Sequence, residues 1–553
     1  MTTQGQERLL RGAPASPGLA FGLAWRLDPP APGSDGDVPE ADREAERERA
    51  LAALEAAARE LDALAGRLAE QGRGSESDIV ATDALMARDP ALAAGVECAV
   101  ARGRPAPAAL QAAAQELAAP LLALDDPTLA LRADDLRSVG RRAARLAAGV
   151  QAEGPAGADR TVLVAADLGP ADVAEVDASV SGVALGAGGV TSHAAIVARS
   201  LGLPMVVGLG AELADIETGT PVLVDGSAGR LVAAPASEQV AAADLDRQAR
   251  VAASQRARDE RELPAMTRDG HRVRVLANVA SRAEVETALA SGAEGVGLLR
   301  TELAFMEAGA WPGQPEHERA LRPVLEALAG RVATVRLLDF GGDKTPPFLR
   351  GATARGVELL LAAPEALAAQ VGAIAAAATG VELRVLVPMV TEARQVRAVR
   401  LLLGQFGAVG AMVEVPAAAS LADQLAAVAD FLSVGTNDLA SLELGRARDA
   451  AEPAPAHHPA VLRRIAQVVT AGHDAGIPVD VCGEAASDPR VLPLLVGLDV
   501  DELSVGAARV GQVRAAVRAL DHAAARKLAA RALGAESAEE VEQLVAEAAQ
   551  AQG

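Results

Sequence analysis

Aromatic residues are almost absent from this chain of 553 residues. It contains six Phe, two Trp and no Tyr, so its hydrophobic cores must be built from Leu, Val, Ile and Ala. Its two cysteines, Cys98 and Cys482, are too few for a disulfide framework. A chain of this length exceeds a single core, and we expect two to four domains.

Basic charge is also scarce relative to acidic charge. The formal net charge is -22, which argues against a nucleic-acid partner, because duplex binding depends on clustered Lys and Arg. A basic protein partner is electrostatically favoured. No uncharged stretch has the length of a membrane span, and residues 1–12 lack the apolar core of a secretory signal. We therefore expect a cytoplasmic protein with no membrane insertion.

The spacing of apolar residues changes several times along the chain. Residues 13–22 predict a short strand and turn, and residues 39–149 have the helical spacing of a bundle of several helices. Residues 160–234 alternate strand-like runs with helical pieces, which is typical of a compact α/β unit. The polar, helix-periodic residues 236–263 predict a linker helix.

Eight short apolar runs follow Pro264, most of them separated by helical stretches. They are VRVLANV, GVGLLR, VATVRLLDF, LRVLVPMV, AVGAMVEV, FLSVGTN, IPVDVCG and ELSVG. Eight runs favour a closed (β/α)8 barrel over an open doubly wound sheet, and such barrels place their chemistry at the C-terminal strand ends. Polar residues follow these runs at Arg300, Glu302, Asp339, Asp343, Lys344, Glu414, Asn437, Asp438, Cys482 and Glu484.

His193 lies in the glycine-rich motif GAGGVTSHAAIVARSLGLPMVVG, residues 186–208. Thr191 or Ser192 can cap the helix that follows, which puts His193 in its first turn, where free amides and the helix dipole attract phosphate. A neutral imidazole there can accept a phosphoryl group and divide one transfer into two steps. A packed or capping histidine is the alternative, and the motif favours a phosphoryl carrier.

The carboxylates, the arginines and the thiol at the strand ends could together form one site for a phosphorylated substrate. Glu414 and Asp438 can hold Mg²⁺, which would neutralise a phosphate and stabilise an enolate, although both can also be salt-bridge partners. Cys482 can protonate an enolate or simply fill the core, and Cys98 is expected to be inert. Cationic groups that can bind phosphate or carboxylate are Arg300, Arg336, Arg355, Arg448 and Lys344.

The chain resembles Enzyme I of the phosphoenolpyruvate-dependent sugar phosphotransferase system over nearly its whole length. The resemblance is carried, in order, by ASPGLAFG, LVAADLGP, GGVTSHAAIVARSLGLP, GAEGVGLLRTELAFM, FGGDK, MVEVPAAA, FLSVGTNDL and VCGEAASD. It implies that His193 is phosphorylated, that Glu414 and Asp438 bind Mg²⁺, and that Cys482 protonates the enolate. It further implies that phosphoenolpyruvate (PEP) is bound by Arg300, Arg355, Asn437, Asp438 and Arg448.

The resemblance also implies an α/β multidomain organisation. An α/β phosphohistidine swivelling domain (1–24 plus 151–235) carries an inserted helical bundle (25–150) that docks the phosphocarrier HPr. A linker helix (236–263), a PEP-binding (β/α)8 TIM barrel (264–535) and a helical tail (536–553) follow, and the barrel forms a homodimer. The implied function is phosphoryl transfer from PEP through His193 to a histidine of HPr, with release of pyruvate, as the first step of sugar uptake.

Three departures from the family pattern leave alternatives open. Gly169 stands where the family often has a Thr that hydrogen-bonds the histidine. Ser441 and Leu442 replace a Gln-Tyr pair, and the shortened segment before Arg355 has Glu358 where a second Arg is usual. These favour a non-catalytic HPr-docking paralogue as one alternative. A dikinase-related PEP-utilising enzyme is the other, and the absence of a Gly-rich phosphate loop before His193 argues against it.

Overall fold

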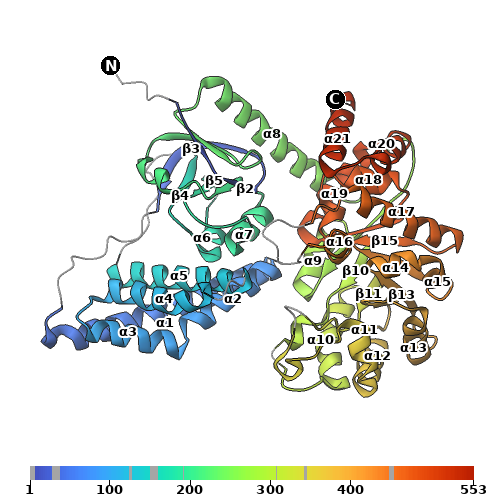
Figure 1. Cartoon of the computed structure of the whole chain (residues 1–553), viewed down its shortest axis with the longest axis horizontal. Coiled ribbons are helices and arrows are strands. Elements are labelled where there is room, and N and C mark those ends of the chain that lie inside the picture. Colours follow the sequence, from blue (N-terminus) through green and yellow to red (C-terminus); the bar gives the residue numbers. More distant parts are fainter. Residues whose placement is uncertain are drawn as a thin grey trace. The chain divides into compact units, whose positions relative to one another are not determined.

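The computed structural model describes residues 7–27, 38–71, 73–123, 127–149, 160–177, 179–190, 192–306, 308–341, 345–446 and 454–552. The chain divides into two compact units, residues 1–252 and residues 253–553 (Figure 1). Helix α8 (Ser237–Asp259) runs across this division. The domain limits expected from the sequence stay a prediction.

An eight-stranded mixed sheet organises the first unit, with strand order β1-β8-β7-β3-β4-β5-β6-β2. On β4, Val162 and Val164 join the apolar cluster on one face, whereas Leu163 and Ala165 join the cluster on the other, so both faces are covered. Helix α7 packs on the second face through Ala194, among others. The strands are β1 (Arg8–Arg11), β2 (Ala13–Ser16), β3 (Leu19–Arg26), β4 (Thr161–Ala165), β5 (Val180–Leu185), β6 (Met205–Val207), β7 (Pro221–Asp225) and β8 (Arg230–Ala233). The helices beside them are α6 (Pro170–Ala174) and α7 (His193–Leu201).

A bundle of helices fills the sequence between β3 and β4 (Figure 1). Its core is rich in Ala, and α4 and α5 approach so closely that a Cβ added at Gly140 would lie 2.4 Å from the Cβ of Ala114. Small side chains therefore set the helix spacing and offset the shortage of aromatics. The helices are α1 (Arg43–Glu70), α2 (Gly74–Ala87), α3 (Pro90–Ala101), α4 (Ala106–Leu122) and α5 (Pro127–Ala148).

Eight parallel strands close into a barrel in the second unit, which confirms the predicted TIM barrel. The strands are β9 (Arg274–Val279), β10 (Gly295–Leu299), β11 (Val332–Arg336), β12 (Glu382–Val387), β13 (Ala408–Val413), β14 (Phe431–Gly435), β15 (Val479–Cys482) and β16 (Glu502–Gly506). Helices alternate with the strands and end the chain: α9 (Arg282–Ala290), α10 (Gln314–Glu326), α11 (Gly356–Leu361), α12 (Pro364–Ala377), α13 (Ala393–Leu403), α14 (Pro416–Ser420), α15 (Ala422–Ala426), α16 (Thr436–Glu443), α17 (Pro459–Asp474), α18 (Leu492–Gly497), α19 (Val510–Ala519), α20 (His522–Gly534) and α21 (Ala538–Gln552).

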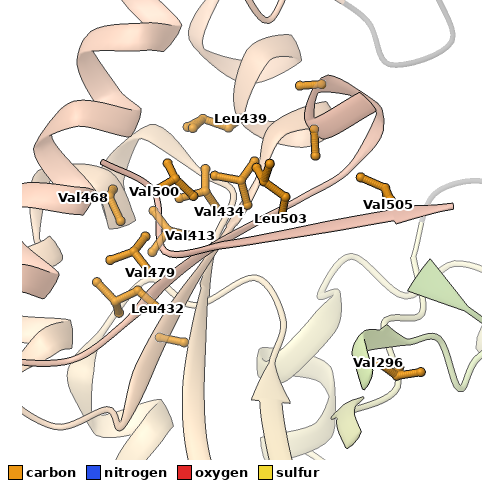
Figure 2. Packing of buried hydrophobic residues seen from close by; sticks show 14 of the residues in the cluster. Val296, Val413, Leu432, Val434, Leu439, Val468, Val479, Val500, Leu503 and Val505 are labelled. Atoms are coloured by element: carbon orange, nitrogen blue, oxygen red, sulfur yellow. The ribbon is translucent and has the colours of Figure 1, made fainter. Parts of the chain in front are cut away.

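Alternate residues of each barrel strand face the surrounding helices and the barrel interior. Figure 2 shows Leu432 and Val434 of β14 in the same buried cluster as Val468 of α17. Phe431 and Cys482 belong instead to a separate, smaller cluster that occupies part of the barrel interior. This alternation leaves the interior positions free to carry polar groups toward the mouth.

No helix in the described part of the chain is both long enough and apolar enough to cross a membrane.

The outer layer of the barrel should dominate the stability of the second unit. Leu432 is fully buried, so Leu432→Ala should lower the free energy of unfolding by about 2–5 kcal/mol, since it removes apolar contacts and leaves a cavity. Leu401 on α13 is 85% exposed, and Leu401→Ala should change the free energy of unfolding by less than about 0.5 kcal/mol. Urea titration followed by circular dichroism measures both, and equal midpoints would contradict this packing.

Candidate active site

His193 is the first residue of α7, at the end that exposes free amides. Ser192 caps the helix, and its hydroxyl accepts a hydrogen bond of 3.3 Å from the amide of Ala195. Of the two cap candidates read from the sequence, Ser192 therefore makes the cap bond, and Thr191 lies outside the described residues. The imidazole is 17% exposed, so it is held in place yet accessible.

Asp135 of α5 fixes the orientation of the His193 ring. Its carboxylate lies 2.9 and 3.1 Å from Nδ1 of His193, and its side chain is only 5% exposed. A carboxylate can only accept hydrogen bonds, so in a neutral ring the proton lies on Nδ1 and the lone pair on Nε2. Nε2 is therefore the nitrogen that can act as nucleophile.

Charged side chains of α5 surround a small pocket next to His193. Arg132 lies 3.6 Å from Asp135, Arg137 lies 3.2 Å from Asp134, and Arg141 lies 3.0 Å from Asp167. These guanidinium groups contact carboxylates that line the pocket, so they offset negative charge next to His193. The pocket is lined by Leu131, Asp134, Asp135, Asp167, Leu168, Gly169, Pro170, Gly188, Ser192, His193 and Ala194.

Gly169, the first departure noted in the sequence, is matched by Ser138 of α5. A Cβ added at Gly169 would lie 1.8 Å from Oγ and 2.7 Å from Cβ of Ser138. Ser138 thus occupies the space that a larger residue at 169 would need. The hydrogen bond to His193 comes from Asp135, so the lack of a hydroxyl at 169 does not leave the histidine without a partner.

Three carboxylates meet at the C-terminal mouth of the barrel. Glu414 follows β13, is 1% exposed, and accepts a hydrogen bond of 2.6 Å from the amide of Met389. Burial raises the pKa of Glu414, and the carboxylate of Asp339 raises it further. Arg336 lowers this pKa, and Asp438 raises it. Asp438 lies in the first turn of α16. The structure therefore brings Glu414 and Asp438 together, with Asp339 as a third acid.

The arginines at the mouth present buried donors. Arg336 ends β11 and pairs with Glu302 at 2.5 Å and with Asp339 at 3.2 Å. Arg300 follows β10, and Arg355 lies beside Gly341, where an added Cβ would be 2.5 Å from the Cβ of Arg355. Among the described residues, the Nε atoms of these three arginines are buried and donate to no partner. Lys344 and Arg448 lie outside the described residues.

Cys482 and Asn437 complete the mouth. Cys482 ends β15, is 1% exposed, and its Sγ donates to the carbonyl oxygen of Val434 at 3.6 Å. Burial raises the pKa of its thiol strongly, so the thiol is protonated and can act as an acid. The Oδ1 of Asn437 accepts a hydrogen bond of 3.2 Å from the amide of Glu484. This bond ties α16 to the segment after β15.

The acidic groups fit a hard divalent cation. Glu414, Asp438 and Asp339 offer oxygen ligands, which Mg²⁺ prefers, and their mutual repulsion would be relieved by a positive ion. Oδ1 of Asp339 is buried and makes no hydrogen bond within the described part of the chain. The donor set is therefore suited to Mg²⁺.

Sequence reasoning missed the partner of His193. Asp135 follows Asp134 on a helix whose apolar face gives no sign of the α/β unit against which it packs. It lies 58 positions from His193, so only the fold brings the two together. The sequence indicates Asp339 as a strand-end acid, but only the fold shows that it lies near Glu414.

The barrel, its charged mouth and the capped histidine together define a PEP-utilising enzyme. Residues 254–522 match the family described as "PEP-utilising enzyme, PEP-binding domain", residues 157–229 match its mobile domain, and residues 11–132 match its N-terminal domain. The chain belongs to the phosphoenolpyruvate-protein phosphotransferase family.

Its relatives show this similarity over nearly the whole chain. The phosphoenolpyruvate-protein phosphotransferase of Streptomyces coelicolor is 38% identical over 97% of this chain and 98% of its own length. That of Haloferax volcanii is 37% identical over 89% of this chain and 90% of its own. The multiphosphoryl transfer protein of Xanthomonas campestris pv. campestris is 37% identical over 97% of this chain, but the chain spans only 66% of its length.

The contact between Gly169 and Ser138 can be tested by a double-mutant cycle. Gly169→Ala should destabilise the first unit by about 1–3 kcal/mol, because its Cβ would collide with the Ser138 side chain. In the background of Ser138→Gly the same substitution should cost about 1 kcal/mol less. Thermal unfolding of the four proteins measures the coupling, and strictly additive losses would exclude the contact.

Proposed function

We propose that this chain transfers the phosphoryl group of PEP to Nε2 of His193 and then to a histidine of the phosphocarrier HPr, releasing pyruvate. The observation that carries the proposal is the His193–Asp135 pair at the start of α7, which leaves Nε2 as a nucleophile. The charged barrel mouth supplies a site for the donor. The relatives named phosphoenolpyruvate-protein phosphotransferase support the same reaction.

The barrel mouth binds and orients PEP. Arg300 and Arg355, whose buried Nε atoms have no partner among the described residues, donate to the phosphate and carboxylate of the substrate. Asn437, Asp438 and Arg448 complete the substrate site, as the family resemblance implies. Glu414 and Asp438 hold Mg²⁺, which would neutralise the phosphate and stabilise the charge of the departing enolate.

The transfer itself uses three side chains of this chain. Nε2 of His193 attacks phosphorus while Asp135 holds the proton on Nδ1 and stabilises the positive charge that develops on the ring. The Cys482 thiol gives its proton to the methylene carbon of the enolate, which leaves as pyruvate. The phosphoryl group then passes from Nε2 to HPr.

The two compact units divide this work. His193 lies in one and the barrel mouth in the other, so the reaction requires that the phosphohistidine domain (1–24 plus 151–235) meet the barrel and afterwards meet HPr. The helical bundle of residues 25–150 docks HPr, helix α8 acts as the linker, and the barrel of residues 264–535 makes a homodimer. The net charge of -22 favours a basic carrier surface. PEP is a cytoplasmic metabolite, which places the reaction in the cytoplasm.

A non-catalytic docking role is the alternative, and it draws on Gly169 and on the shortened segment before Arg355. At Gly169 the departure is matched, because the hydrogen bond to His193 is made by Asp135 and Ser138 fills the space at 169. This match supports the catalytic function.

The proposal is tested by incubating the protein with Mg²⁺ and PEP labelled on phosphorus. The unsubstituted chain should acquire acid-labile, alkali-stable label that chases onto purified HPr, because phosphohistidine has this lability. His193→Ala should acquire no label, and Cys98→Ala, an exposed position in the bundle, should behave as the unsubstituted chain does. Absence of label on the folded, unsubstituted protein would overturn the proposal.

The role of Asp135 gives a separate prediction. Asp135→Asn keeps the shape but can present its amide N–H groups to Nδ1, which would shift the proton to Nε2 and block the nucleophile. We expect the rate of His193 phosphorylation to fall at least about a hundredfold. Nitrogen-15 spectra of the ring should show the change of tautomer, and Asp62→Asn, at an exposed carboxylate of α1 that pairs with Arg88, should leave both rate and tautomer unchanged. An unaltered rate with an altered tautomer would refute the assignment.

A further inference from the structure

A column of polar side chains runs through the barrel interior beneath Cys482. Ser433 of β14 pairs in register with Asp480 of β15, which in turn pairs with Glu502 of β16. Asp480 and Cys482 are two positions apart on one strand and so face the same side of the sheet. Ser433, Asp480, Cys482 and Glu502 are all at most 3% exposed. The column therefore connects the mouth with the interior below it.

Ser433 contacts both of its polar neighbours in this column. Its Oγ lies 2.7 Å from Oδ2 of Asp480 and 3.4 Å from Sγ of Cys482. A hydroxyl has one proton, so Ser433 can donate to only one of them while it accepts from the other. A hydroxyl between two groups that can each hold a proton is the arrangement of a proton relay.

Burial and a neighbouring carboxylate favour the protonated form of Asp480. Burial raises the pKa of Asp480 to about 8, and the carboxylate of Glu502 contributes to the rise. Glu502 itself is compensated, because it accepts from Arg384 at 2.7 Å and from Arg274 at 2.8 Å. Near neutral pH, Asp480 is therefore mostly a neutral carboxylic acid directly next to Ser433.

The proposed reaction creates a need for such a group. Each transfer consumes the thiol proton of Cys482 and leaves a thiolate in a site where burial strongly disfavours that charge. A second turnover requires that the thiol be restored. Cys482 is 1% exposed, and with PEP or pyruvate bound at the barrel mouth a proton supplied from inside the barrel would not depend on release of the ligand.

We propose that Ser433 and Asp480 return a proton to Cys482 after each turnover, a role that rests on the function proposed above. The O–H bond of Asp480 breaks as its proton moves to Oγ of Ser433, and the proton of Ser433 moves to Sγ, forming the S–H bond. Asp480 is left as a carboxylate. It regains a proton from solvent at the far end of the column, where the Arg274 side chain is 31% exposed.

The test compares the first turnover with later ones in Asp480→Asn and Ser433→Ala. Cys482 starts protonated, so rapid-quench measurement should show one phosphohistidine and one pyruvate per chain in both variants. Steady-state pyruvate release with excess HPr should then fall at least about tenfold, because the thiol is restored slowly. Ser504→Ala is the matched control, since its buried hydroxyl lies on the strand next to Cys482 but bonds Asn278. Steady-state rates within twofold of the unsubstituted chain in both relay variants would overturn the relay.

The first-turnover amplitude separates the relay from the function on which it rests. If the unsubstituted chain forms neither phosphohistidine nor pyruvate, the proposed function fails and the relay fails with it. If the first turnover is intact in every protein, only the relay is at issue.

A measurement on the unsubstituted protein avoids any effect of substitution on folding. With Mg²⁺ and pyruvate in deuterium oxide, the reverse step moves a methyl proton of pyruvate to the thiolate form of Cys482 and leaves the enolate. A relay from below can then replace this proton by a deuteron, which returns to the carbon while the ligand stays bound. Mass spectrometry at early times should then find more pyruvate with two or three deuterons than pyruvate with one deuteron. Exchange limited to one deuteron at early times would show that Cys482 is restored only through the open mouth, against the proposal.

Discussion

The hydrogen bond from Nδ1 of His193 to Asp135 determines what the first unit can do. In a neutral ring it assigns the proton to Nδ1 and the lone pair to Nε2, and it is possible only because the helical bundle packs against α6 and α7. Ser192 adds a cap that aligns the ring with the start of α7. The bundle is therefore part of the active site as well as a candidate docking surface, since without α5 the histidine would lose its hydrogen-bond partner.

The second unit solves a different electrostatic problem. Buried acids at the barrel mouth repel one another, and Arg336 offsets this by pairing with Glu302 and Asp339. Glu414 stays poorly compensated, and buried donors of Arg300 and Arg355 have no partner in the described part of the chain. A divalent cation together with an anionic substrate would satisfy both deficits, which supports the proposal that PEP and Mg²⁺ bind here together.

The sequence predicted the elements better than it predicted their contacts. Eight apolar runs after Pro264 were enough for the closed barrel, because strand periodicity and strand-end polarity are local signals. The cap at Ser192 was equally local. The sequence did not indicate Asp135 and Ser138, because they contact His193 and Gly169 from a helix far away in the sequence. Gly169 therefore suggested that His193 lacks a hydrogen-bond partner. The link from Cys482 through Ser433 to Asp480 depends on strand register, which no single run reveals.

The most direct test of this account is to identify the atom of the phosphorylated protein that carries phosphorus. Correlated phosphorus-31 and nitrogen-15 spectra of the chain, labelled with nitrogen-15 in histidine and treated with Mg²⁺ and PEP, resolve the two ring nitrogens. We predict phosphorus on Nε2 of His193, with the proton retained on Nδ1. Phosphorus on Nδ1, or on any residue other than His193, would contradict it.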